Sequence, residues 1–489
     1  MIVTVCALVL LILLLKSFRG KKTLPGPWNL PILGYLHKLD PKSPHLSLTK
    51  LAQKYGPVYN IKLGSINAVV IADVKILKKV LAKDETLGRP SLFMIDTVFE
   101  NKGAACQKYT FGNLIVFAGL VFTSVDLWKD QRKFLANFLK TAGISKVSPN
   151  RKKWEMLVTN QVEKILQVMK SQTHGVPVNP SEFVTQYANS IAELLLVGKQ
   201  SSQEDKTVTG GEKVASVTFR GPLNFMPFLR VLPYFKKTLS SAKQSVNKVR
   251  QNQRKLITDF EKSSKDGVPN LVETFQQQMS HPIYNFDQLQ HLIYDLFMTF
   301  NEPIITSLLW ILLFLAQYHE VQDKVRQELF EVSLGETVTM DDFANLHYTR
   351  ATIAETARIR TLAPTGLPHS VSETICVEGF TIPKGAMILP LLWAIHMDPN
   401  LHEKPDEFRP GRFLDDEGKF FEPESFLPFQ SGKRMCLGKE IAQTAMSLFV
   451  ANVVKDFKIE RPDSSVLDLT GVYGVVLVPK PQTLIFKKI

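Results

Sequence analysis

Cys436 lies in a short segment whose residue types could together hold a flat, acidic ligand. The segment, FQSGKRMCLG, contains Phe429, Gly432, Arg434, Cys436 and Gly438 and ends just ahead of a predicted helix. The positive end of a helix dipole should lower the pKa of the Cys436 thiol and favour the thiolate. The glycines let backbone approach a ligand closely, Arg434 can bind a carboxylate through two hydrogen bonds, and Phe429 can shield the sulfur from water. A single cysteine beside a basic residue is most often an inert buried thiol, whereas the whole arrangement favours a binding site.

Two charged residues on one predicted helix, Glu355 and Arg358, are spaced to form an ion pair. Residues three apart share a helix face, and Arg412, further along the chain, could complete a buried triad with them. The alternative is a solvated surface pair, which would contribute little to stability.

Trp128 and Arg132, four residues apart, share one face of another predicted helix. The neighbouring residues Lys129 and Lys133 make this helix basic. His369 is a further candidate, and the sequence alone favours neither a structural role nor a ligand contact for it.

The composition is that of an ordinary folded protein with a large core. Of 489 residues, 45% are hydrophobic and 21% are charged, which excludes intrinsic disorder, a collagen-like fibre and a polytopic membrane bundle. The formal net charge of +13 would suit nucleic acid, anionic lipid or an acidic protein partner. The four cysteines, at positions 6, 106, 376 and 436, have neither zinc-site nor disulfide-framework spacing.

The first residues predict a retained membrane anchor. Residues 1–15 carry no charged side chain and would span about 23 Å as a helix, against ~30 Å of hydrocarbon core; basic residues follow from Lys16 onward. A cleaved signal peptide would carry its basic residues before the apolar run, and positive charges stay in the cytosol. We therefore expect a transmembrane anchor at 1–16, a basic, proline-rich linker at 17–35, and one globular domain at 36–489 that faces the cytosol.

Hydrophobic periodicity predicts a mainly helical body with small β-sheets, which is an α+β fold. The predicted helices are 44–55, 74–83, 127–139, 154–169, 287–316 and 439–454, and the predicted strands are 58–63, 68–72 and short segments around 370–392 and near both ends. Residues 170–235 indicate loops and weakly amphipathic pieces. Within them, the apolar run 225–229 is either a mobile lid or a second membrane contact.

The Cys436 segment matches the F-x-x-G-x-R-x-C-x-G haem-binding loop of the cytochrome P450 family, which the chain resembles over nearly its whole length. Glu355–Arg358 matches the family's E-x-x-R, and FRPGRF at 408–413 resembles its F-x-P-x-R-F segment. Trp128 and Arg132 match W-x-x-x-R on the helix whose arginine meets a haem propionate. The proline-rich linker and several shorter segments are similar to those of microsomal arthropod members.

This resemblance implies haem b (iron protoporphyrin IX), with Cys436 as its axial thiolate and metal ligand. It places the following residues around the haem: Trp128, Arg132, His369, Phe429, Gly432, Arg434 and Gly438. The implied activity inserts one oxygen atom from O₂ into a lipophilic substrate, with electrons from NADPH through NADPH-cytochrome reductase on the endoplasmic reticulum membrane. A basic face would dock that donor, and nucleic acid is not expected as a partner. This face comprises Lys129, Arg132, Lys133, Lys433 and Lys439.

The long predicted helix departs from the family at its centre. The usual A/G-G-x-E/D-T-T is TFNEPI at 299–304, so Glu302 keeps the acid, Pro303 replaces the alcohol that delivers protons, and Phe300 replaces a glycine. Proline removes an i→i−4 hydrogen bond, which frees the carbonyl of Thr299. We predict that Thr299 holds a water through this carbonyl and its hydroxyl, and that Glu302 is the second catalytic residue.

Several activities remain open from the sequence. An oxygenase with a reorganised proton relay is favoured, because Glu302 is kept and the cysteine loop has its normal length. An O₂-independent peroxide isomerase or dehydratase, and a haem-containing binder without turnover, are the alternatives. The Glu-Pro pair is similar to that of the Spook/Spookier group of ecdysteroid-biosynthetic enzymes, which implies a sterol substrate; a juvenile-hormone or xenobiotic-oxidising member is the alternative.

Overall fold

The protein is described by a computed structural model over ten segments of the chain. These segments are 24–98, 119–123, 125–145, 147–198, 222–260, 269–279, 284–333, 335, 337–462 and 466–489. The predicted anchor at 1–16, residues 17–23 of the predicted linker, and Cys6 and Cys106 lie outside them.

Helices make up most of the described chain, and their bounds follow. The α-helices are α2 (Pro44–Tyr55), α3 (Val74–Leu81), α4 (Phe93–Val98), α5 (Val125–Thr141), α6 (Arg151–Gln172), α7 (Ser181–Val197), α9 (Pro233–Phe260), α10 (Leu271–Gln276), α11 (Phe286–Gln317), α12 (His319–Val332), α13 (Met340–Phe343), α14 (His347–Ile359), α15 (Leu392–His396) and α16 (Lys439–Asp456). The 3-10 helices are η1 (Leu36–Lys38), η2 (Asp84–Thr86), η4 (Pro222–Asn224), η5 (Pro227–Val231) and η6 (Pro410–Phe413).

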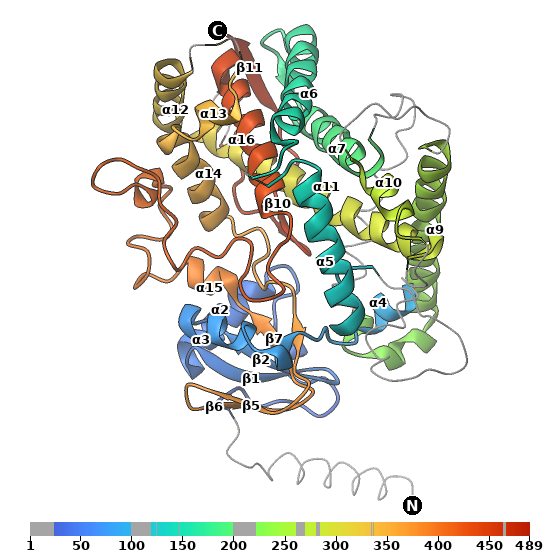
Figure 1. Ribbon diagram of the computed structural model, residues 1–489. Helices are drawn as coiled ribbons and strands as arrows, with labels where there is room; N and C mark the ends of the chain where they lie inside the picture. Colours follow the sequence, from blue (N-terminus) through green and yellow to red (C-terminus); the bar gives the residue numbers. More distant parts are fainter. Residues whose placement is uncertain are drawn as a thin grey trace, which may run out of the picture.

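The strands form small sheets, of which β1, β2, β5, β6 and β7 lie at one end of the molecule, β11 lies at the other, and β10 lies between them (Figure 1). They are β1 (Val58–Leu63), β2 (Ile66–Ile71), β3 (Pro177–Val178), β4 (His369–Ser370), β5 (Ile375–Val377), β6 (Phe380–Ile382), β7 (Met387–Pro390), β8 (Phe457–Glu460), β9 (Val472–Tyr473), β10 (Leu477–Val478) and β11 (Leu484–Lys488). The largest sheet has the order β1-β2-β7-β4, in which β2 and β7 are parallel and the other pairs antiparallel. The order β3-β11-β8 forms a second sheet, and β5-β6 and β9-β10 are separate two-stranded pairs. The expected α+β class is confirmed.

Helix α11 is the central element of the core. It packs against α7, α9, α14 and α16, and its side chains Leu308, Leu315 and Trp310 are almost completely buried. Among the described residues, α11 is the one helix that is both long enough and apolar enough to cross a membrane. However, 56% of its most apolar stretch is buried in the protein. It therefore serves as a core helix that carries the 299–304 segment to the middle of the molecule.

The elements predicted from the sequence are largely found, with one clear exception. The helix predicted at 287–316 is α11, the one at 439–454 is α16, and the predicted hairpin is β1–β2. The prediction of loops and weak pieces over 170–235 is wrong for α7, a 17-residue helix. The helical signal was present in the sequence, because apolar residues of α7 recur at three-to-four spacing and polar residues lie on the opposite side. The apolar residues are Phe183, Val184, Tyr187, Ala188, Ile191 and Leu195, and the polar ones include Glu182, Gln186 and Asn189.

The predicted triad of Glu355, Arg358 and Arg412 is confirmed as a buried network. Arg358 donates to both carboxylate oxygens of Glu355, at 2.7 and 2.8 Å, and Arg412 Nε donates to Oε1 at 3.0 Å. The backbone amide of Arg409 adds a further hydrogen bond to Oε1, at 2.9 Å. Because Glu355 and Arg358 are completely buried, each charge depends on the others for compensation. The network fixes α14 to the segment around η6.

Candidate functional site

The Cys436 segment is a tightly folded loop that ends at Gly438, just before α16 begins. The amide of Cys436 donates to the carbonyl of Phe429 at 3.1 Å, and Gly438 is the residue just before the helix. Gly432 has a positive φ of 79°, and a Cβ there would lie 2.2 Å from the carbonyl oxygen of Leu81. Only glycine meets both conditions, so Gly432 is required to dock the loop against the end of α3.

The thiol of Cys436 does not have the lowered pKa that its place near a helix start predicts. Its side chain is exposed at the surface of the site, yet the surrounding protein desolvates the sulfur and raises its pKa above the ordinary value. The amide of Gly438 and the guanidinium of Arg132 act in the opposite direction with smaller effect. The expectation that the helix dipole alone would favour the thiolate is therefore wrong, and a bound cation would be needed to deprotonate the sulfur.

Positive charge is concentrated beside this loop. Arg434 lies with its guanidinium 4.6 Å from the ring centre of Trp128, and Arg132 lies 5.7 Å from the same ring. Arg132 also donates to the carbonyl of Met435 at 2.9 Å. Burial, with repulsion from Arg89 and Arg132, lowers the pKa of Arg434 to about 8. The sequence prediction that Trp128, Arg132 and Arg434 come together with Cys436 is thus met by the geometry.

The guanidinium cluster of Arg89, Arg132 and Arg434 has no carboxylate partner among the described residues. Arg434 donates instead to the carbonyls of Val121 at 3.3 Å and Thr123 at 2.9 Å. Its Nε atom is buried without a hydrogen-bond partner, as are the hydroxyls of Ser431, in the same loop, and of Thr123, whose carbonyl Arg434 contacts. Unpartnered buried polar groups are costly, so this place suits a ligand that brings acceptors and negative charge.

His369 is buried and both of its ring nitrogens have protein partners. Nδ1 lies 2.8 Å from the carbonyl of Thr86, and Nε2 lies 3.1 Å from the amide nitrogen of Gln430. Burial, and repulsion from Arg89, lower the pKa of His369 well below its usual value, so the ring is neutral. In that state it donates through Nδ1 and accepts from Gln430, which orients the start of the cysteine loop.

Two residues of this site, Arg89 and Gln430, escaped the sequence analysis. Arg89 donates to the carbonyls of Pro368 at 2.7 Å and Val121 at 3.1 Å, and burial lowers its pKa to about 10. Its position, more than three hundred residues before Cys436, carries no spacing signal. Gln430 occupies a position that the F-x-x-G-x-R-x-C-x-G pattern leaves unspecified, and its backbone has a positive φ of 61°.

The proposed catalytic residues Thr299 and Glu302 lie in the middle of α11, which continues through Pro303. The hydroxyl of Thr299 donates to the carbonyl of Asp295 at 2.7 Å. Next to Glu302, the buried side chain of Asn301 turns away and donates to Asn189 of α7 at 3.0 Å. Because Pro303 has no amide hydrogen, the carbonyl of Thr299 lacks its usual helical donor.

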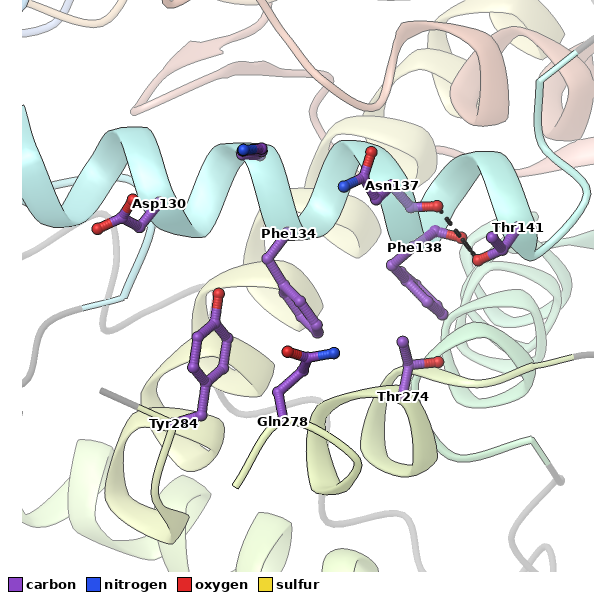
Figure 2. A pocket seen from close by; sticks show the side chains of 9 residues that line it. Asp130, Phe134, Asn137, Phe138, Thr141, Thr274, Gln278 and Tyr284 are labelled. Atoms are coloured by element: carbon purple, nitrogen blue, oxygen red, sulfur yellow. Dashed lines mark hydrogen bonds between the residues drawn. The ribbon is translucent and has the colours of Figure 1, made fainter. Parts of the chain in front are cut away.

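A separate pocket of about 510 Å³ lies along α5 (Figure 2). It is lined by Asp130, Lys133, Phe134, Asn137, Phe138, Thr141, Thr274, Gln278 and Tyr284. A helix turns about 100° per residue, so the middle of this set of α5 residues lies opposite Trp128 and Arg132, and Lys133 lies at its edge. Phe134, Phe275 and Tyr284 pack with ring centres 5.1 to 5.5 Å apart beside it. The pocket is thus distinct from the Cys436 site.

Comparison with known proteins identifies the family. A sequence profile described as Cytochrome P450 matches residues 24–486, so the chain belongs to the cytochrome P450 family. Cytochrome P450 306a1 of Drosophila melanogaster is 29% identical over 95% of this chain and 89% of its own length. Cytochrome P450 2J3 of Rattus norvegicus is 30% identical over 96% of this chain and 92% of its own length, and cytochrome P450 2S1 of Homo sapiens is 31% identical over 90% and 86%.

The family assigns a haem-dependent monooxygenase activity and a haem bound through a cysteine thiolate, and the residues near Cys436 fit that cofactor. The haem carries two carboxylates on one edge, and the guanidinium cluster offers positive charge with no described acidic partner. The unpartnered Nε of Arg434 adds a donor. The exposed sulfur of Cys436 is available as a ligand. The donor set therefore matches the charge of the group and its need for a sulfur ligand.

Three glycine substitutions test why Gly432 is required. Gly432→Ala combines left-handed strain with the Leu81 contact and should lower the free energy of unfolding by more than about 2 kcal/mol. Gly418 also has a positive φ, but no atom lies within 4 Å of the Cβ that Gly418→Ala would add. This variant should therefore lower the free energy of unfolding by about 1 kcal/mol. Gly411→Ala has neither feature and should be nearly neutral. Urea denaturation followed by circular dichroism measures all three; equal losses for positions 432 and 418 would contradict the role of the close contact.

Proposed function

We propose that this chain is a haem b monooxygenase in which Cys436 is the axial ligand and Trp128, Arg132 and Arg434 hold the carboxylate edge of the haem. The observation that carries the proposal is the guanidinium cluster beside the exposed sulfur of Cys436. This cluster has no acidic partner among the described residues. Phe429, Gly432, Gly438 and His369 complete the proposed surroundings.

Each of these residues has a separate task. A thiolate-bound haem activates O₂ for insertion of one oxygen atom into a C–H bond. Arg434 and Arg132 neutralise its carboxylates, while Trp128 stacks against both guanidiniums. Gly432 lets the loop dock on α3. The carbonyl of Phe429 accepts a hydrogen bond from the amide of Cys436 and so fixes the loop. His369 keeps Gln430 oriented at the start of the loop.

Proton delivery, on the side of the proposed haem that faces away from Cys436, is assigned to Thr299 and Glu302. The Thr299 hydroxyl donates to Asp295 and keeps lone pairs that can accept from a water. The Thr299 carbonyl, which Pro303 deprives of its helical donor, supplies a second acceptor. Together they hold a water where other members carry an alcohol, and Glu302 exchanges protons with the solvent.

The electron donor is proposed to be NADPH-cytochrome reductase, docked on the basic side of the cysteine loop. Lys433 pairs with Asp84 at 2.6 Å, and Lys439 with Glu422 at 2.9 Å. Lys133 forms no ion pair with a described residue. Charge complementarity speeds association more than it adds affinity, so we assign the main steering role to Lys133 and its neighbour Lys129 on α5.

The substrate is proposed to be a sterol of ecdysteroid biosynthesis. The support is the Glu302–Pro303 pair together with Phe300, whose ring is half-buried on α11 and packs against the main core. A phenylalanine in place of a glycine narrows the space beside α11 and favours a flat ligand.

The protein is further proposed to sit on the endoplasmic reticulum membrane through an anchor at residues 1–16, with a second contact on the catalytic domain. Exposed apolar side chains occur in two segments, and they are Trp28, Ile32, Leu33, Phe228, Val231, Leu232 and Tyr234. The turn between β1 and β2 joins these segments: the amide of Gly64 donates to Leu33 at 3.2 Å, and that of Ser65 to Phe225 at 2.9 Å. A shared apolar surface of this kind marks an interaction site.

The haem assignment and the reaction can be tested together. The reduced carbon-monoxide complex should show the Soret band of thiolate-ligated haem, and Cys436→Ser should abolish it. Oxygen uptake with NADPH and reductase supports the oxygenase, whereas peroxide consumption without NADPH would establish the isomerase or dehydratase instead. Spin-state titration with sterols, juvenile-hormone analogues and xenobiotics then ranks the substrate classes, and a weaker response to sterols than to the others would reject the sterol proposal.

The role of Thr299 predicts uncoupling when its hydroxyl is removed. Thr299→Val loses one hydrogen bond to the proposed water, and the ratio of product formed to NADPH consumed should fall about tenfold while hydrogen peroxide release rises. Thr299→Ser keeps the hydroxyl and serves as the matched control. Wild-type coupling in the valine variant would rule out this water site.

The second membrane contact predicts a polarity change at Val231. In a haem-loaded Cys6→Ser, Cys106→Ser, Cys376→Ser background, in which Cys436 is the proposed haem ligand, an environment-sensitive dye on Val231→Cys should shift to the blue when the full chain is placed in lipid nanodiscs. The same dye on Val147→Cys, an equally exposed valine between α5 and α6 (78% exposed, against 66% for Val231), should not shift. Identical behaviour at both positions would argue that residues 225–232 do not touch the membrane.

A further inference from the structure

A short segment next to the Cys436 site, residues 119–123, is held by a carboxylate of the central helix. The amide of Val121 donates to Oδ2 of Asp295 at 2.8 Å, and the amide of Leu120 also donates to this carboxylate. Gly119 passes so close to Asp295 that a Cβ atom added to this glycine would lie 2.2 Å from Oδ2 of Asp295. We call residues 119–123 the strap.

The carbonyls of the strap bind the arginines of the proposed haem site. The carbonyl of Val121 accepts from Arg89 Nε at 3.1 Å and from Arg434 Nη1 at 3.3 Å. The carbonyl of Thr123 accepts from Arg434 Nη2 at 2.9 Å. The strap therefore donates N–H groups to the Asp295 carboxylate and offers C=O groups to the two arginines from peptide units that follow one another in the chain.

Asp295 is an unusual residue for the interior of a core helix. Burial raises its pKa to about 6, while the strap amides and, to a smaller degree, Arg250 favour the ionised form. Hydrogen bonds from two amides are what make a buried carboxylate tolerable. The backbone carbonyl of Asp295 also accepts from Thr299, which places this residue between the strap and the proposed proton relay.

We propose that Asp295 is a positioning residue that fixes the strap. The carbonyls of the strap in turn hold Arg89 and Arg434 in place to receive the haem carboxylates. This inference rests on the proposed function, because it assumes that Arg434 meets a haem carboxylate. It adds to that function a link between α11, where oxygen chemistry is proposed, and the anchoring of the cofactor.

The test compares Asp295→Asn with Asp287→Asn in the haem-loaded, full-length protein. Asparagine keeps the size of the side chain, but its NH₂ group faces a strap amide and cannot accept a hydrogen bond. Hydrogen exchange at Leu120 and Val121 should rise about tenfold or more, release of haem to an acceptor protein should become faster by a similar factor, and exchange in α14 should stay unchanged. Asp287, at the exposed start of the same helix, forms an ion pair with Arg254 at 3.4 Å and with no other described residue, so its variant should match the wild type.

The possible failures are distinguishable. Unchanged exchange at Leu120 and Val121 in Asp295→Asn overturns the inference. Faster strap exchange with unchanged haem release also overturns it, unless Arg434→Gln likewise leaves haem release unchanged, in which case the proposed role of Arg434 has failed instead. If Asp295→Asn does not fold, Gly119→Ala keeps the charge and displaces the strap through the 2.2 Å contact, and the same exchange and haem-release measurements decide the question.

Discussion

The cytochrome P450 site of this protein depends on buried positive charge that the described chain does not neutralise. Arg89, Arg132 and Arg434 lie close enough for their repulsion to lower the pKa of Arg434 to about 8, and backbone carbonyls rather than carboxylates are their partners. Carbonyl dipoles compensate a buried cation only in part. Binding of an acidic cofactor and stability of this region are therefore coupled, since a ligand that binds the folded state stabilises it.

A second cluster of charged residues shows the contrasting arrangement. Glu355 lies between Arg358 and Arg412 with its oxygens at 2.7 to 3.0 Å from the guanidinium nitrogens, and the backbone amide of Arg409 completes its shell. This cluster carries its own counter-charge and needs no ligand. It therefore holds α14 and the η6 segment together whether or not a cofactor is bound, while the cluster beside Cys436 remains available for binding.

Much of the arrangement followed from local sequence patterns. The cysteine loop, the Glu355–Arg358 pair, the Trp128–Arg132 pair and the long helix with Pro303 were all readable, because each depends on residues that are neighbours in the chain or on one helix face. Helix α7 was missed although its apolar residues have helical spacing, so this was a misread local pattern. Arg89 and Gln430 were missed because their roles depend on contacts with Pro368, Val121 and His369, which lie far away in the sequence or carry no spacing signal.

The sequence by itself determined the family, the cysteine that offers a thiolate, and the loss of the usual alcohol on the central helix, since these depend on residue identity at fixed spacing. The tertiary structure decided which charges are compensated and what the sulfur experiences. Desolvation by the surrounding protein raises the pKa of Cys436 against the helix dipole, and the path of residues 119–123 between Asp295 and Arg434 exists only in the folded chain. Burial and long-range hydrogen bonding arise when distant segments pack together, which is why no local pattern could report them.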